Sequence, residues 1–257
     1  MSVYDGMASD FDRRRALPNG VPETIRNAVL RAGLPPRPRL LDLGAGTGRI
    51  GWPFVRAGDD YTGADLSFGM LRTFAARHRG VRLIQANGAL LPFRDASFDA
   101  VMLIQVLSGV PGWRAFLADA MRVLRPAGTL ITGRVVAPDD GIDAQMKFRL
   151  AAILDSMDIH PYRGTPRDDA LSWLDRQMPA PHILTAANWV AERTPRGFIE
   201  RHGSGARFSV VADAIRQEAM LRLGAWAVEQ FGSLDTVWAE QHRFELTIHR
   251  RQQGTVT

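Results

Sequence analysis

Residues 40–50 read LLDLGAGTGRI. A short apolar run that contains Asp42 leads directly into glycines at positions 44, 46 and 48. An apolar run followed by a glycine-rich loop predicts a buried strand, a tight turn and the start of a helix, an arrangement that usually binds phosphate or a dinucleotide. A carboxylate at this point does not suit an anionic ligand. Beside a diphosphate, Asp42 would cost about 1 to 4 kcal/mol at about 4 Å.

The composition limits the class of protein. At 257 residues the chain can bury a substantial core and suits one domain, or one domain with a cap. It has no cysteine, which excludes disulfides, a thiolate nucleophile and cysteine-ligated metal. The N-terminal stretch has no apolar segment, and no run approaches the ~20 apolar residues of a membrane span. We therefore expect a cytoplasmic protein that does not cross a membrane.

The net charge of +5 raises the question of an anionic partner. Lys147 is the only lysine among the 32 basic residues, and the arginines are scattered, with the densest cluster at 13–15. This scatter argues against a nucleic-acid substrate, which stays an alternative.

The order of apolar patterns predicts an α/β protein. From about 22 to 136, helical and strand patterns alternate, as in a parallel sheet with helices on both faces. Strands are expected at 39–43, 61–67, 81–87, 98–106 and 129–136, and helices at 22–33, 48–57, 67–80 and 113–124. Pro53 is expected to bend the second of these helices.

Beyond residue 136 the alternation lapses. A helix is expected at 143–157, and Thr165 has the form of a cap for another. Strands near 183–193 and 238–250 and helices from Thr194 and at 211–231 follow. We therefore divide the chain into an N-terminal lid segment (1–21), a cofactor-binding core (22–136), a helical cap (137–181) and the C-terminal part of the core sheet (182–257).

An ammonium group on the ligand would turn the Asp42 penalty into an attraction. S-adenosylmethionine (SAM) carries such a group, and the glycines let the backbone approach it closely. Asp65 lies 21 residues after Gly44 at the end of the second strand, where a carboxylate accepts hydrogen bonds from ribose hydroxyls. NAD shares this ribose contact, so only Asp42 and Asp65 together favour SAM. A tight turn with a solvated Asp42 is the structural alternative.

Four stretches in order, LLDLGAGTGR, YTGADLSFGML, ANGALLPFRDASFDAV and VLRPAGTLIT, resemble the class I SAM-dependent methyltransferases of the Rossmann-like type. The resemblance implies a mostly parallel seven-stranded sheet with helices on both faces, an antiparallel last strand and a helical cap insertion after the fifth strand. It implies SAM as cofactor and S-adenosylhomocysteine as product. The cofactor-binding residues that it implies are Asp42, Gly44, Ala45, Gly46, Thr47, Gly48, Asp65, Leu66, Met70, Asn87, Gly88, Ala89 and Gln105.

The chain departs from the family pattern in two places. Asn87 and Gly88 stand where Asp-Ala is usual, and Ala127 stands where the second residue of Pro-Gly-Gly is usual. The N-terminal stretch VYDGMASDFDRRRALP resembles a lid segment of many relatives, which implies that Tyr4, Phe11 and Arg15 lie over SAM. A solvated N-terminus is the alternative.

Methyl transfer needs alignment, and it needs a general base only if the acceptor is protonated. His160, between the two expected cap helices, is the first candidate, with a solvated loop residue as the alternative. His242 and His249 are expected at the surface or the sheet edge. Asp139, Asp140 and Asp143 suit helix capping as well as catalysis. The sequence shows no metal-ligand spacing, so we expect no metal.

We therefore predict a SAM-dependent methyltransferase that acts at O, N or C of a small molecule. The alternatives are an RNA or protein methyltransferase, and a SAM-binding protein with other chemistry or none. Trp173, Trp189 and Phe148 could line an acceptor pocket, or pack in the core. The sequence does not identify the acceptor, the methylated atom or the oligomeric state.

Overall fold

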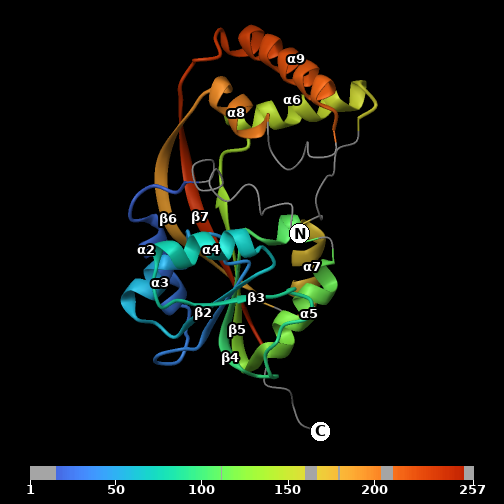
Figure 1. Cartoon of the computed structure of the whole chain (residues 1–257). Coiled ribbons are helices and arrows are strands. Elements are labelled where there is room, and N and C mark those ends of the chain that lie inside the picture. The colour runs from blue at the N-terminus through green and yellow to red at the C-terminus, as the bar shows by residue number, and fades with distance from the viewer. Residues whose placement is uncertain (1–15, 111, 160–166, 179, 204–210, 252–257) are drawn as a thin grey trace. The chain divides into compact units, whose positions relative to one another are not determined.

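The structure, a computed structural model, describes residues 16–110, 112–159, 167–178, 180–203 and 211–251 (Figure 1). Tyr4, Phe11 and Arg15 of the expected lid lie outside the described residues, as do the expected base His160 and the expected cap residue Thr165. The roles assigned to these residues stay predictions.

Each expected strand has an observed counterpart. The strands are β1 Leu40–Leu43, β2 Tyr61–Asp65, β3 Arg82–Gln85, β4 Phe98–Ile104, β5 Leu124–Val136, β6 His182–Arg193 and β7 Trp238–Arg250. The helices are α2 Val21–Leu30, α3 Trp52–Ala57, α4 Phe68–Arg77, α5 Trp113–Val123, α6 Ile142–Ser156, α7 Arg167–Gln177, α8 Pro195–His202 and α9 Asp213–Phe231, with a 3₁₀ turn η1 at Leu107–Gly109.

The sequence led us to expect that Pro53 bends a helix at 48–57. The structure differs, because Pro53 does not lie in the interior of a helix. The helix starts at Trp52, so that Pro53 lies in its first turn, where a backbone N–H has no partner inside the helix. The residues before it, 44–51, form the glycine loop instead of a first helical turn. The loop is therefore longer than the glycine spacing alone predicted.

The seven strands form one sheet in the order β3-β2-β1-β4-β5-β7-β6, and β7 is antiparallel. The pairs β1–β2, β2–β3, β1–β4 and β4–β5 are parallel, which confirms the predicted fold class. Chain order reverses between β1 and β4, and open α/β sheets bind ligands beyond the carboxyl ends of the strands at such a reversal. The glycine loop follows β1 at this point.

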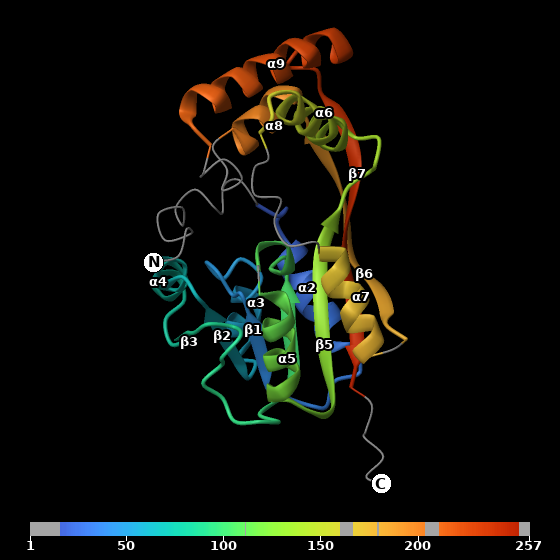
Figure 2. The same cartoon turned by 90° about the vertical axis from the view of Figure 1, so that its right-hand side faces the viewer.

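The chain divides into two compact units. We call Met1–Val135, Thr165–Ala187 and Phe244–Thr257 the core unit, and Val136–Gly164 with Asn188–Arg243 the second unit. In the core unit α2, α3 and α4 lie on one face of the sheet and α5 and α7 on the other (Figures 1 and 2).

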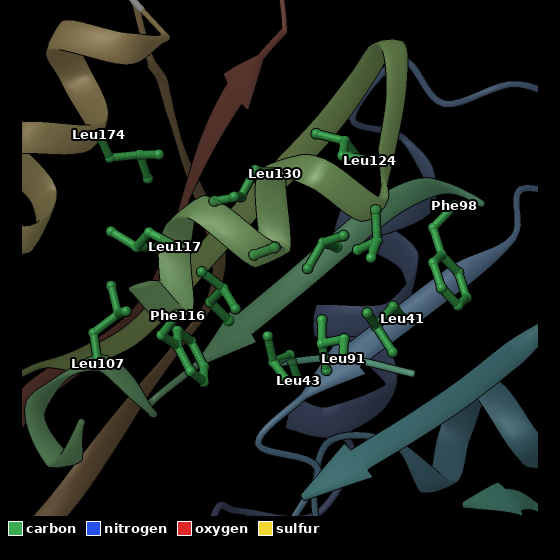
Figure 3. Packing of buried hydrophobic residues seen from close by; sticks show 14 of the residues in the cluster. Leu41, Leu43, Leu91, Phe98, Leu107, Phe116, Leu117, Leu124, Leu130 and Leu174 are labelled. Carbon is green, nitrogen blue, oxygen red and sulfur yellow. The ribbon is translucent and has the colours of Figure 1, made fainter. Parts of the chain in front are cut away.

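Two separate apolar clusters stabilise these units. In the core unit, Leu41 and Leu43 of β1 pack with Phe116 and Leu117 of α5 and with Leu174 of α7 (Figure 3). In the second unit, buried side chains of α6, α8 and α9 pack against one another, namely Ile142, Met146, Leu150, Ile153, Leu154, Phe198, Ala219, Leu223 and Ala227.

The two compact units divide the chain differently from the expected segments. The expected cap of residues 137–181 contains α7, but Ala170 and Leu174 of α7 belong to the buried cluster of the core unit. Conversely, α8 and α9, which were assigned to the C-terminal part of the core, pack with α6. The apolar faces of these helices decide the division, and sequence order does not reveal which helices share a core.

No helix in the described part of the chain combines the length and the hydropathy needed to span a bilayer.

Candidate functional site

The glycine loop is built on left-handed backbone. Gly44, Gly46 and Gly48 have φ of +90°, +57° and +83°, which L-residues adopt only at a cost. A Cβ on Gly44 would lie 2.6 Å from Val106, and one on Gly48 would lie 2.2 Å from the ring of Phe74. At Gly46 a Cβ would make an ordinary van der Waals contact, 3.9 Å from the Gly44 carbonyl oxygen. Gly44 and Gly48 therefore serve internal packing, whereas no side chain packs closely against Gly46.

The Asp42 carboxylate is buried under this loop. Asp42 is 2% exposed, and its Oδ2 accepts a hydrogen bond of 2.7 Å from the Tyr61 hydroxyl. The pKa of Asp42 is raised to about 6, mainly by burial; the Tyr61 hydrogen bond lowers it in part, and the nearby Asp65 charge adds a smaller upward shift. A cation beside Asp42 would offset the cost of burying its charge.

Sequence reasoning missed Tyr61 as the partner of Asp42. Asp42 pairs with Gly63 in the parallel register, and Tyr61 lies on the same face two residues before Gly63. A Cβ on Gly63 would approach the Tyr61 hydroxyl oxygen to 3.4 Å, and one on Gly51 would approach it to 2.1 Å. The two glycines thus leave room for the phenol, and a signal was present in the spacing Y-x-G of the second strand.

Asp65, at the end of β2, joins the loop to the next helix. Its Oδ2 accepts from the Gly46 N–H at 2.8 Å, and its Oδ1 accepts from the Ser67 N–H at 2.8 Å. Ser67 caps α4 as predicted, since its hydroxyl oxygen accepts from the Met70 N–H at 3.3 Å. The structure therefore brings Asp65 together with the glycine loop, as a ligand site shared by β1 and β2 requires.

Asn87 and Gly88 follow β3. The Asn87 side-chain oxygen accepts from the Ala89 N–H at 3.0 Å, which forms a local turn, and the residue is exposed. Gly88 is buried, and a Cβ there would lie 2.3 Å from the Phe116 ring. Phe116 thus occupies the space that an alanine side chain would need, which gives a packing reason for this departure from the family pattern.

Gln105 lies just past the end of β4 in a strained conformation. Its φ is +56°, uncommon for a residue with a side chain, although its N–H donates to the Gly133 carbonyl at 2.9 Å. Its side-chain oxygen accepts from the guanidinium of Arg49, the residue after Gly48. Sequence reasoning placed Gln105 at the site but missed Arg49.

The other predicted cofactor residues differ in exposure. Ala45, Thr47 and Met70 are buried at 8%, 3% and 3%, whereas Leu66 is 58% exposed. Leu66, between Asp65 and Ser67, thus presents an apolar side chain at the carboxyl end of β2.

Sequence comparison agrees with this geometry. Residues 41–132 match the family described as methyltransferase domain, and they include the whole glycine loop, Asp65, Asn87 and Gln105. Residues 41–132 are thus similar to the methyltransferase domain family, in line with the resemblance to the class I SAM-dependent methyltransferases.

Curated proteins that are similar to this part of the chain include demethylmenaquinone methyltransferases. That of Renibacterium salmoninarum is 34% identical over 142 residues, which are 54% of this chain and 60% of the relative. That of Corynebacterium urealyticum is 40% identical over 139 residues, 53% of this chain and 60% of the relative. The chain thus spans about 60% of the length of these two relatives.

Solved structures share the fold. A Bacillus halodurans protein described as a candidate methyltransferase superimposes with a TM-score of 0.59 at 18% identity, covering 91% of this chain and 100% of that one. A Haemonchus contortus phosphoethanolamine N-methyltransferase, solved with phosphomonomethylethanolamine and S-adenosylhomocysteine, gives a TM-score of 0.54 at 15% identity and covers 97% of this chain and 58% of that one. At such identities the likeness concerns the fold alone.

Among the candidate acids outside residues 41–132, Asp143 has structural partners. Asp143 pairs with Arg201 at 2.6 Å and with Arg193 at 3.7 Å. His242 and His249 are 3% and 0% exposed, and β7 lies between β5 and β6, so the expectation that they lie at the surface or the sheet edge was wrong. Their strand alternates buried and exposed residues, and His242 falls on the buried side. Among the described residues no three metal-binding side chains are grouped to hold an ion.

Proposed function

We propose that the chain transfers a methyl group from SAM to a small-molecule acceptor. The observation that carries the proposal is the buried Asp42 carboxylate directly before the glycine loop. An anionic diphosphate would repel it, and the ammonium of a methionine moiety would pair with it. A carboxylate whose pKa is raised to about 6 is stabilised by such a cation.

The residues present fit this cofactor. A Cβ on Gly46 would come no closer than 3.9 Å to another atom, and Asp65 accepts the 2.8 Å hydrogen bond from the Gly46 N–H. In the proposal, the glycine loop and Asp42 hold the methionine part, Asp65 the ribose hydroxyls, and the residues after β2 and β3 the adenine. The full set is Asp42, Gly44, Ala45, Gly46, Thr47, Gly48, Asp65, Leu66, Met70, Asn87, Gly88, Ala89 and Gln105.

When bound, SAM supplies a methyl group that its sulfonium already activates. The task of this chain's residues is to hold the acceptor atom and the methyl carbon about 3 to 3.5 Å apart and in line. Gln105, strained and held by Arg49, lies at the end of the strand next to β1, where a fixed side chain can position a reactant. The chain's contribution to the rate is therefore mainly orientation.

A methyl-transfer assay tests the activity. The protein is incubated with methyl-labelled SAM and a panel of phenols, amines, reduced quinones and RNA, and products are identified by mass. Reduced demethylmenaquinone belongs in the panel because relatives carry that name. Labelled small-molecule product supports the proposal. Label in RNA only, lost as salt rises, would replace it by nucleic-acid methylation, and SAM binding without product would replace it by a binding role.

A further inference from the structure

Arg49 and Gln105 make a polar contact at the carboxyl end of the sheet, where the chain order reverses. Arg49 follows the last glycine of the loop, and Gln105 follows β4, the strand that pairs with β1. Both residues are half-buried and belong to the core unit. The side-chain oxygen of Gln105 accepts a hydrogen bond from Nη2 of Arg49. The contact therefore joins the glycine loop to the end of the neighbouring strand.

This contact determines which way the Gln105 amide points. A guanidinium group has donors only, so the amide atom that faces Arg49 must be the oxygen. The amide nitrogen then points away from Arg49 with two N–H donors. Among the residues that the structure describes, none accepts a hydrogen bond from this nitrogen. The two donors are thus available to a ligand.

The backbone of Gln105 is held in a conformation that side chains disfavour. Its φ of +56° lies in the left-handed region, and its N–H donates to the Gly133 carbonyl oxygen at 2.9 Å. The next residue, Val106, packs against the loop, since a Cβ on Gly44 would come within 2.6 Å of it. Such conformations cost free energy and persist where the surroundings enforce them, most often at ligand sites. The donors of Gln105 therefore have a fixed position beside the loop.

The two ends of the loop carry opposite charges. The Asp42 carboxylate precedes the loop, and the Arg49 guanidinium, which is charged at any working pH, follows its last glycine. In an amino acid the ammonium and the carboxylate are attached to the same carbon atom. A ligand whose ammonium lies beside Asp42 therefore places its carboxylate close by. N–H donors next to a guanidinium suit that carboxylate, because hydrogen bonds to ionised groups are the strong ones.

We propose that the Gln105 amide, oriented by Arg49, binds the carboxylate of the methionine moiety of SAM. This inference rests on the proposed function and adds a specificity to it. The site selects the amino-acid form of the ligand over the same amine without a carboxylate. Gln105 contacts the cofactor, whereas Arg49 is a positioning residue that fixes the amide and adds positive charge.

Two matched probes test the proposal by calorimetry, S-adenosylhomocysteine and its decarboxylated analogue. Both carry the adenosine and the ammonium, and they differ only in the carboxylate. The wild-type protein should bind S-adenosylhomocysteine at least about tenfold more tightly, which is the size of a hydrogen bond to a charged group. Gln105→Gly should bring the ratio of the two dissociation constants to about one. Glycine adopts left-handed backbone freely, so this variant should keep the fold.

Gln105→Glu gives the sharpest outcome. An ionised Glu side chain still accepts from Arg49, but it has no donor to offer, and its charge repels a carboxylate. The order of the two affinities should therefore reverse, so that the decarboxylated analogue binds more tightly than S-adenosylhomocysteine.

Arg49→Met tests the positioning role, and Arg56→Met is the matched control. Arg56 lies in the last turn of α3, is exposed, and has its guanidinium over the Trp52 ring, 5.8 Å from the centroid. Arg49→Met should lower the ratio of the dissociation constants several-fold, and Arg49→Lys should restore part of it. Arg56→Met removes the same charge and should leave the ratio unchanged. An equal fall in Arg49→Met and Arg56→Met would contradict the role of Arg49.

Equal binding of the two probes by the wild type, or a ratio that neither Gln105 variant changes, would overturn the inference. The same titrations separate the two levels of the argument, because both probes keep the ammonium and the ribose. If both probes bind with equal affinity, only this inference fails. If neither probe binds, the proposed function fails.

Discussion

The burial of Asp42 favours a cationic cofactor and lowers the free energy of unfolding of the protein without ligand. A pKa of about 6 compared with 3.8 in the unfolded chain means that ionised Asp42 destabilises the fold above pH 6 by up to about 3 kcal/mol. Because the folded pKa is raised, this cost is absent below about pH 4 and develops between pH 4 and 6. A bound ammonium would recover part of it.

Asp42→Asn should therefore stabilise the protein without ligand at pH 8, by up to about 3 kcal/mol, while it weakens SAM binding. Asparagine keeps an oxygen for the Tyr61 hydroxyl but carries no charge to bury. Urea unfolding at pH 8 and at pH 4 measures the effect, and the gain should vanish at pH 4. A variant less stable than the wild type at pH 8, with unchanged SAM affinity, would remove Asp42 from the proposed role.

Asp65 has a role in the loop that must be separated from its proposed role in binding ribose. Asp65→Ala should weaken S-adenosylhomocysteine binding by about 1.5 to 3 kcal/mol if the carboxylate accepts from the ribose hydroxyls. A ligand lacking the 2′-hydroxyl provides the control in a double-mutant cycle. The penalty for losing that hydroxyl should appear in the wild type and disappear in the variant. If the wild type and the variant lose the same affinity when the 2′-hydroxyl is missing, Asp65 acts only through its bonds to Gly46 and Ser67.

At the scale of elements, the glycine loop divides into packing and binding positions. Gly48→Ala would place a methyl group against Phe74 on left-handed backbone and should destabilise the protein by about 2 to 5 kcal/mol. Gly46→Ala would cause no clash, because its Cβ comes no closer than 3.9 Å to another atom, and should cost only about 1 to 2 kcal/mol. It should nevertheless weaken SAM binding. Thermal unfolding and calorimetry measure the two effects.

Gly80→Ala is the matched control for the loop. Gly80 is also left-handed, with φ of +79°, and a Cβ there would meet nothing within 4 Å. Its substitution should cost as much stability as that of Gly46 and leave SAM affinity unchanged. Equal SAM affinity in all three variants would show that the loop does not contact the cofactor.

The elements were predictable where local patterns decide them. The apolar run before Gly44, the Ser67 cap and the strand at 98–106 follow from spacing and residue type, and the structure has each of them. The start of α3 was not predictable, because residues 44–51 have a helical alternative that the loop's bonds to β2 exclude. Asp42 and Asp65 were predictable from their positions beside the glycines, whereas Tyr61 and Arg49 depend on the register of neighbouring strands.

For the whole molecule, the grouping of helices is the feature that sequence order does not reveal. Whether α7 packs with α5 or with α6 depends on which apolar faces meet, and these contacts are distant in sequence.

The two units also contain titrating groups with opposite effects on stability. Asp42 in the core unit loses an unfavourable charge on acidification, whereas His202 in the second unit would gain one.

His202 should make the second unit sensitive to acid. Burial lowers the pKa of His202 to about 4, and its ring stacks on Phe198 with centroids 4.0 Å apart. Because the pKa of His202 is lower in the folded than in the unfolded chain, the free energy of unfolding is unaffected by this residue above pH 6.5. It falls by up to about 3 kcal/mol as the pH falls from 6.5 to 4. Hydrogen exchange of α6 and α8 amides should show this loss, and His202→Gln should reduce it. The same acid loss in both proteins would contradict the assignment.

The central claim, that the glycine loop binds a cationic methyl donor and not a dinucleotide, is tested most directly by calorimetry at pH 8 on the unmodified protein. SAM and S-adenosylhomocysteine, which both carry the ammonium group, should bind with one-to-one stoichiometry, and NAD should give no signal. Tight NAD binding with no signal from SAM would contradict the account.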